Sequence, residues 1–223
     1  MQYSNEATID FDNICSISDE KRRYYSFLST YKSVIDTVEA RAKACSLTME
    51  QKGQRNPIDI VKSRIKSTSG IREKLDEKNL TYTYENMSLI KDIAGIRIIC
   101  PFIDDVYTVE EYFLSQQDME LVEKRDYIEN PKESGYKSLH LIMKINLYSP
   151  EGIKPVLFEI QIRTIAMELW GNIEHKLRYK KDLPKDVDEE ILKRLVAYSE
   201  LMSTLDDDFK TLREKVDKST ETK

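Results

Sequence analysis

Two acidic residues stand out because each lies at or within a predicted strand. Asp92 precedes the β-branched run 93–100, and Glu159 lies inside the strand predicted over 156–162. Two carboxylates from two strands can hold Mg²⁺ when phosphate oxygens and water complete its octahedral shell. One of them can also act as a general base toward an attacking hydroxyl. Asp92 and Glu159 therefore predict a magnesium site that acts on phosphates.

The groups that could meet those phosphates are side chains, because the sequence has neither a GxxxxGK[ST] nor a GxGxxG loop. Arg64 and Lys66 lie two residues apart on a predicted strand and so share a face, and Arg72 and Lys74 follow on the next predicted helix. A guanidinium offers phosphate oxygens a planar fork, and an ammonium offers a compact charge. Taken alone, these residues would be an ordinary solvated basic patch.

The segment 156–164 alternates apolar and polar side chains. Its even-numbered apolar residues face the core, and Glu159, Gln161 and Arg163 share the other face. The plain alternative is an antiparallel strand with one face in water.

The segment 130–140 combines a turn with basic and aromatic residues. Gly135 lets the chain turn before a strand, Tyr136 could stack on a base, and Lys132 and Lys137 could meet phosphates. The alternatives are an ordinary core tyrosine and, for His140, a histidine satisfied within its strand.

Periodicity places these residues on a mixed α/β framework. Strands are predicted over 64–66, 93–100, 139–147 and 156–162, and helices over 69–78, 104–114 and 164–180. A loop is expected over 50–56, then a helix N-cap at Asn56 with Pro57 in the first turn. Strands that alternate with helices favour an α/β (α+β) fold with a mixed β-sheet flanked by helices.

Long amphipathic helices are predicted at both ends, over 18–44 and 186–216. In the second, apolar residues from Ile191 to Val216 recur at steps of three and four. This stripe must be covered, either by packing within the chain, for example on the matching stripe of the first helix, or by a subunit interface. We expect residues 1–17 to be flexible and residues 18–218 to form one domain.

The amino-acid composition limits the kinds of protein that this chain can be. The 223 residues suffice for one domain, and with 40% hydrophobic residues they can form a core even though 34% are charged. A net charge of −5 disfavours DNA and membrane surfaces as partners. Cys15, Cys45 and Cys100 form no CxxC pair, which favours a reduced compartment. No apolar run reaches the length of a membrane span, so a cytoplasmic protein is expected.

Five motifs in a fixed order resemble the synthetase domain of RelA/SpoT-type enzymes. They are RIK at 64–66, DIAGIR at 92–97, RDYI at 125–128, KESGYKSLH at 132–140 and EIQIRT at 159–164. The resemblance runs from about residue 20 to residue 210, and the short chain is similar to the small alarmone synthetases in particular. It implies a nucleotidyltransferase-like fold and transfer of the β,γ-pyrophosphate of ATP to the 3′-hydroxyl of GDP or GTP, giving (p)ppGpp and AMP.

The resemblance also implies a role for each candidate residue. Two arginines sandwich adenine by cation–π stacking, and two lysines hold the ATP phosphates. One carboxylate binds Mg²⁺, and the other assists at the metal or takes the proton of the 3′-hydroxyl. Four further residues, among them a tyrosine stacked on guanine, bind the acceptor nucleotide. In that order the residues are Arg64 and Arg97; Lys66 and Lys74; Asp92 and Glu159; and Lys132, Tyr136, His140 and Gln161.

Departures from the family pattern leave acceptor preference and regulation open. Glu123 stands where the RxKD signature of long relatives has its first basic residue, so GDP, GTP and GMP remain possible acceptors. Asp59 and Lys62 stand where an alarmone pocket at the centre of some tetrameric relatives would have Glu and Thr. Neither His140 nor His175 precedes an aspartate, so no hydrolase domain of the long relatives is expected.

The implied partners are ATP, GDP or GTP, further copies of the chain in a homotetramer, and a regulatory alarmone or single-stranded RNA. Two other functions compete with alarmone synthesis. One is a pyrophosphotransferase that uses ATP or tRNA as acceptor, and the acidic net charge disfavours tRNA. The other is a non-catalytic nucleotide or RNA sensor, which would gain little from two bare carboxylates beside phosphates.

Overall fold

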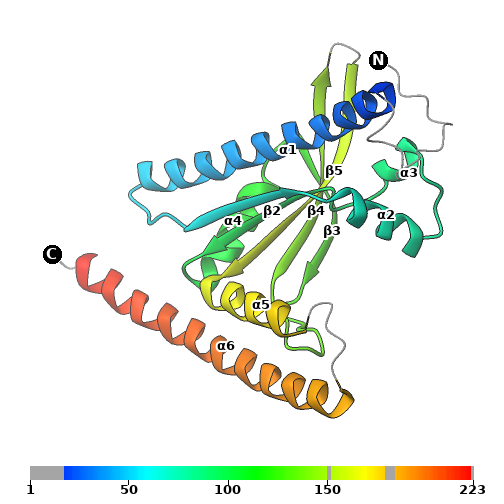
Figure 1. Ribbon diagram of the computed structural model, residues 1–223. Helices are drawn as coiled ribbons and strands as arrows, with labels where there is room; N and C mark the ends of the chain where they lie inside the picture. Colours follow the sequence, from blue (N-terminus) through cyan, green and yellow to red (C-terminus); the bar gives the residue numbers. More distant parts are fainter. Residues whose placement is uncertain (1–17, 150–151, 179–183, 222–223) are drawn as a thin grey trace.

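A five-stranded sheet lies between two long helices in the computed structural model (Figure 1), which describes residues 18–149, 152–178 and 184–221. This confirms the mixed, helix-flanked sheet. None of the described helices is long and apolar enough to cross a membrane. The elements are α1 (Ser18–Gln51), β1 (Ile60–Ile65), α2 (Thr68–Glu77), α3 (Tyr84–Ser88), β2 (Ala94–Cys100), α4 (Ile103–Leu114), β3 (Met119–Asp126), β4 (Leu139–Ser149), β5 (Gly152–Thr164), α5 (Ile165–Arg178) and α6 (Lys185–Glu221).

The strands lie in the order β1-β2-β5-β4-β3, and only β2 and β5 are parallel. Their register places Gly95 beside Glu159 and Arg97 beside Gln161. On the far side of β5, His140 of β4 lies beside Gln161. Because side chains at paired positions share a face, the central strands collect the polar motif residues on one side of the sheet.

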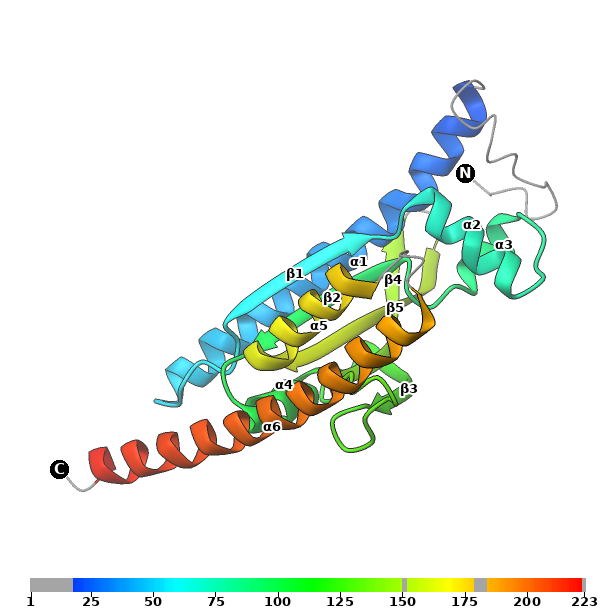
Figure 2. The same ribbon diagram turned by 60° about the horizontal axis from the view of Figure 1, so that its bottom comes forward.

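The opposite face of the sheet carries the hydrophobic core. Helix α1 packs there along Tyr31, Ile35 and Val38, all at most 2% exposed, and α4 covers the rest. Phe158 and Ile160 illustrate the tight packing of β5, since neither has measurable exposure. Helix α5 lies over the polar face, and α6 packs on α5 (Figure 2).

Several local predictions need correction. The predicted helix start at Asn56 is wrong: its side chain accepts the N–H of Ile58 in a turn, and the chain then enters β1. The loop begins later in the chain than predicted, because α1 continues to Gln51. Strand β3 and the short helix α3 were not predicted. β3 was not recognised because it is an edge strand with five charged residues. A bulge between Leu121 and Glu123 also breaks the alternation of its apolar residues.

The stripes of the two terminal helices do not pack on each other. α1 lies on the core face and α6 beyond α5, on opposite sides of the sheet (Figure 1). The stripe of α6 is only partly covered, since Leu195 is buried while Tyr198, Leu205 and Phe209 are about half exposed. Packing within the chain therefore accounts for α1 but leaves much of α6 open. The flexible segment predicted over residues 1–17 lies outside the described residues.

The covered side of α6 holds the segment 132–138 in place. Ser199 donates its hydroxyl to the carbonyl oxygen of Gly135, and Lys137 donates to Ser203. Gly135 has φ +86°, and a Cβ there would lie 3.0 Å from Cβ of Ser199 and 3.2 Å from Cα of Val196. Both the backbone angle and the close approach require glycine.

Asp206 makes the docking of α6 sensitive to pH. Its carboxylate accepts the hydroxyl of Thr164, which in turn caps α5 by accepting the N–H of Met167. Burial raises the pKa of Asp206 from 3.8 to about 6, against the lowering effect of the Thr164 hydrogen bond. An acid whose pKa is raised on folding disfavours the fold once it is ionised, so stability falls as pH rises through the window from about 4 to about 6.

We therefore expect Asp206→Asn to raise the free energy of unfolding at pH 7 by about 1–2 kcal/mol, allowing for some solvent screening of the carboxylate. The amide oxygen can still accept the Thr164 hydroxyl. Urea unfolding at pH 7 and pH 4 measures the effect, and the gain should shrink several-fold at the lower pH. Asp208→Asn, at an exposed position of the same helix, is the control. An equal gain at both pH values would contradict this account of Asp206.

Candidate functional site

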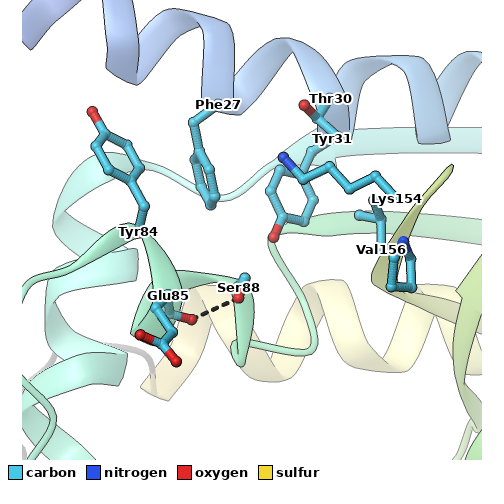
Figure 3. Close-up of a pocket in the computed structure, with 9 residues that line it drawn as sticks. Phe27, Thr30, Tyr31, Tyr84, Glu85, Ser88, Lys154 and Val156 are labelled. Atoms are coloured by element: carbon cyan, nitrogen blue, oxygen red, sulfur yellow. Dashed lines mark hydrogen bonds between the residues drawn. The ribbon is translucent and has the colours of Figure 1, made fainter. Parts of the chain in front are cut away.

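A groove of about 500 Å³, including its open side, lies on the polar face of the sheet. Four of the predicted site residues line it, from β1, β2 and β5. A second pocket, between α1, α3 and β5 (Figure 3), contains none of them and is walled by Phe27, Tyr31 and Tyr84. The groove is therefore the candidate site. Its lining is Lys62, Ser63, Arg64, Gly95, Ile96, Arg97, Glu159 and Gln161.

The two predicted adenine-binding arginines lie diagonally across β1 and β2. Arg64 pairs with Gly95, and its Cγ and Nε lie 3.7 Å from where a Cβ of Gly95 would be, so the Arg64 stem crosses the strand. Arg97 lies two residues further along β2, opposite Lys62. Diagonal neighbours on a sheet are roughly 7–8 Å apart. That backbone spacing is about twice the thickness of an aromatic ring, and the stacking of adenine between the two arginines stays a prediction.

One end of the sheet carries the predicted phosphate and metal residues. Lys66 directly follows β1, and its ammonium lies 2.6 Å from a carboxylate oxygen of Asp92. The Ser67 side chain then caps α2 by accepting the N–H of Gly70. Lys74, on α2, is bound to Glu77 at 2.6 Å. The hydrogen bond to Glu77 raises the pKa of Lys74, and the charge of Asp92 adds to this rise.

Glu159 belongs to a closed ring of hydrogen-bonded side chains. Its Oε1 lies 3.1 Å from Nδ1 of His140, whose Nε2 lies 2.8 Å from the Tyr136 hydroxyl. Arg163 donates to that hydroxyl and to Oε1 of Gln161, both at 2.8 Å. The Gln161 amide closes the ring by donating to Oε2 of Glu159 at 2.8 Å. Three predicted acceptor residues and the predicted catalytic carboxylate are thus physically connected.

This ring keeps Glu159 ionised. Burial alone would raise the pKa of Glu159, but hydrogen bonds from His140 and Gln161, together with the charge of Arg64, outweigh it, and the net shift is downward. At neutral pH the group is a carboxylate that accepts hydrogen bonds or binds a cation. The low pKa makes it a modest proton acceptor and a strong source of negative charge.

The polar face of β5 is less exposed to solvent than the alternation of apolar and polar residues suggests. Arg163 is 2% exposed and Glu159 is 8% exposed, because α5 and the segment 132–138 cover this end of the strand. Glu168, on the first turn of α5, lies 3.3 Å from Arg163. The alternative of a strand with one wet face is therefore wrong for Glu159 and Arg163, although Gln161 remains partly exposed.

Lys132 lies against two aromatic rings at the predicted acceptor end of the site. The Lys132 ammonium lies 4.7 Å from the ring centroid of Tyr127 and 5.0 Å from that of Tyr136. Tyr136 also makes edge contacts with His140 and Trp170. Tyr136 is thus half-buried and firmly held, with a cation against its ring. The stacking of a base on Tyr136 stays a prediction.

Asp92 lies in the turn before β2 and Glu159 lies on the neighbouring strand β5, and they have different partners, since Asp92 pairs with Lys66 and Glu159 with His140. Among the described residues no group of three or more His, Cys, Asp or Glu could hold a metal by itself. Two carboxylates suit Mg²⁺, which commonly takes one or two protein carboxylates and completes its shell with phosphates and water. The donor set therefore fits a substrate-dependent magnesium site.

Sequence reasoning missed three contributors to the site. Glu168 binds two arginines, yet an acid in the first turn of a helix is already explained by the helix dipole. Tyr127 directly follows β3, which was not predicted. Trp170 anchors α6 by donating its indole N–H to the carbonyl oxygen of Leu195 at 2.8 Å. The nearest available signal was the position of Arg163 on the same strand face as Glu159.

Comparison with known proteins confirms the resemblance. A family model described as "Region found in RelA / SpoT proteins" matches residues 63–183. The GTP pyrophosphokinase YjbM of Bacillus subtilis is 36% identical over 197 residues, which cover 88% of this chain and 92% of that protein.

Two solved structures of small alarmone synthetase 1 from Bacillus subtilis have the same fold. One, bound to its product pppGpp, has a TM-score of 0.78 at 36% identity and covers 88% of this chain and 99% of the other. The other, bound to AMPCPP, has a TM-score of 0.72 at 32% identity and covers 88% and 98%. The motifs, the groove and these matches agree: the chain belongs to the RelA/SpoT family and is similar to the small alarmone synthetases.

Proposed function

We propose that this chain transfers the β,γ-pyrophosphate of ATP to the 3′-hydroxyl of GDP or GTP, forming (p)ppGpp and AMP. The observation that carries the proposal is the hydrogen-bonded path from the arginine-lined groove, through Gln161 and Glu159, to His140 and Tyr136. A donor nucleotide in the groove and an acceptor beside Tyr136 would meet at Glu159. The membership in a family of GTP pyrophosphokinases supports the same reaction.

The chain's residues act mainly by positioning and charge. Arg64 and Arg97 hold adenine between two guanidinium planes, and Lys66 and Lys74 meet the phosphates. Glu159 accepts the hydrogen bond of the 3′-hydroxyl and increases the electron density on its oxygen. His140 and Gln161 hold the Glu159 carboxylate in place. Pyrophosphoryl transfer needs aligned reactants and neutralised charge rather than a covalent intermediate.

Asp92 and Glu159 are the residues that would bind Mg²⁺. The ion supplies charge neutralisation at the transferred phosphates. Before ATP binds, the ion pair with Lys66 stabilises Asp92; with ATP present, Lys66 can turn to a phosphate and free the Asp92 carboxylate. Cys45 and Cys100 are free, buried thiols, in keeping with the reduced cytoplasm expected from the sequence.

Incubation of the purified protein with Mg²⁺ and ATP labelled in the γ-phosphate tests the reaction directly. Separate reactions contain GDP, GTP, GMP or tRNA, and the products are separated by chromatography. Label should move to GDP or GTP, with AMP released in equal amount. Label on tRNA alone would show the other transferase, and no transfer to any acceptor would contradict the proposal and favour a nucleotide sensor.

Glu159→Gln should lower kcat by about 10²-fold or more, because the variant loses the charge that acts on the 3′-hydroxyl and the cation. The change is nearly isosteric, so the thermal unfolding midpoint should move little. The matched control is Glu120→Gln, an exposed glutamate on β3 that pairs with Lys144. Near-normal turnover by Glu159→Gln would exclude a catalytic role for this residue.

We also propose that copies of the chain assemble through α5 and α6, as a tetramer by analogy with the family. Exposed apolar side chains line both helices, next to the side of α6 that packs on the domain. Exposed apolar stripes of this length mark a subunit interface more often than a free surface. Binding of a regulatory alarmone or single-stranded RNA stays a prediction. The exposed residues are Ile165, Leu169, Ile173 and Leu177 on α5 and Tyr198, Leu201, Leu205, Phe209, Leu212 and Val216 on α6.

Leu205→Glu combined with Phe209→Glu should split the assembly, because charges replace apolar groups that a partner would bury. Light scattering at micromolar concentration measures the mass, and the folded monomer should keep its thermal transition. Thr204→Glu with Thr211→Glu is the control, since both threonines are exposed on another side of α6. A wild-type protein that is monomeric under these conditions would exclude the interface.

A further inference from the structure

Glu168 is a buried carboxylate that no part of the proposed reaction uses. It lies on the first turn of α5, is 7% exposed, and binds a cation from each of three neighbouring strands. Lys62 of β1 lies 2.9 Å from its Oε1, and Arg97 of β2 and Arg163 of β5 lie 3.2 Å and 3.3 Å from its Oε2. Asn172 also donates to Oε1, at 3.2 Å. One negative charge thus connects the three cations beside the groove.

The contact between Glu168 and Arg97 fixes the plane of the Arg97 guanidinium group. Nη1 of Arg97 binds Glu168, while Nε and Nη2 bind Oε1 of Gln161 at 3.4 Å and 3.3 Å. A planar guanidinium held along two edges cannot rotate freely, so the orientation of its plane beside the groove is fixed. The distances are long for hydrogen bonds, so orientation depends on the charge of the carboxylate.

Glu168 also offsets repulsion on this side of the sheet. Lys62 pairs directly with Arg97, and Arg163 lies two positions from Gln161, the partner of Arg97 on β5. Like charges at such positions repel one another. Burial raises the pKa of Glu168, but the hydrogen bond from Lys62 and the charges of Arg97 and Arg163 outweigh it, so the group is ionised at neutral pH. Without this charge Arg97 would turn toward solvent, away from Arg163.

We propose that Glu168 is a positioning residue for the donor nucleotide: it holds the Arg97 guanidinium face-on to the groove, where adenine stacks against it. This inference rests on the proposed function, because it assigns adenine to the space between Arg64 and Arg97. A merely structural ion pair would instead affect all ligands of the site alike, through the stability of the fold.

Calorimetric titration with two probes separates these roles. The probes are AMPCPP, which carries adenine, and inorganic tripolyphosphate, which lacks it. Glu168→Gln should bind AMPCPP about 3- to 30-fold more weakly, the range that corresponds to losing one desolvated cation–π contact. Its affinity for tripolyphosphate should change less than twofold. In turnover assays KM for ATP should rise, while kcat and KM for GTP stay close to the wild-type values.

Two variants provide matched controls. Glu110→Gln makes the same change at another buried helix carboxylate, which pairs with Lys124 on the far face of the sheet. Asn172→Ala removes one hydrogen bond from Glu168 without touching Arg97. Both should bind AMPCPP as the wild type does. If Glu168→Gln proves too unstable to purify, Glu168→Asp keeps the charge but shortens the reach, and should show the same selective loss.

A double-mutant cycle tests whether Glu168 acts through Arg97. In an Arg97→Lys background, which lacks the planar group, Glu168→Gln should weaken AMPCPP binding by less than twofold. Unchanged AMPCPP binding in the single variant, equal losses for both probes, or a full additional loss in the Arg97→Lys background would each overturn the inference. A wild-type protein that fails to bind AMPCPP would instead count against the proposed function.

Discussion

The parallel pairing of β2 with β5 is the constraint on which the site depends. It is the one parallel contact in the sheet, and its register sets Gly95 beside Glu159 and Arg97 beside Gln161. A slip of one residue would turn every one of these side chains toward the core. The apolar residues of β5, such as Phe158 and Ile160, forbid that slip because they fill the space below α1 and α4. Packing on one face therefore sets the chemistry of the other.

The polar face is a balance of charge rather than an open basic surface. Arg163 and Glu168 are buried, and their attraction offsets the cost of removing both from water. Lys66 and Asp92 form a further ion pair, and Glu159 accepts hydrogen bonds from His140 and Gln161. An acidic protein can in this way present cations to a phosphate without a large positive surface.

Sequence reasoning reached the central strands and most of the site because their signals are local. The alternation of β5 identified Glu159 and Gln161, and Gly135 marked a turn that the structure confirms with φ +86°. Contacts between segments distant in the sequence could not be predicted. Nothing near Glu168 in the chain indicates that Lys62 lies 2.9 Å away, and nothing near Gly135 indicates that Ser199 touches it. β3 was missed because an edge strand needs polar residues, which hide its period.

The docking of the segment 132–138 on α6 has a thermodynamic consequence. Opening that segment means breaking the hydrogen bond between Ser199 and Gly135, so its local opening free energy includes part of the cost of loosening the helix. Whatever orders α6 from its exposed side therefore also holds Tyr136 and Lys132 more firmly. In the proposed assembly, a nucleotide that ordered these residues would by reciprocity strengthen association at the helix by the same factor. The two faces of one helix would then couple substrate binding to quaternary structure.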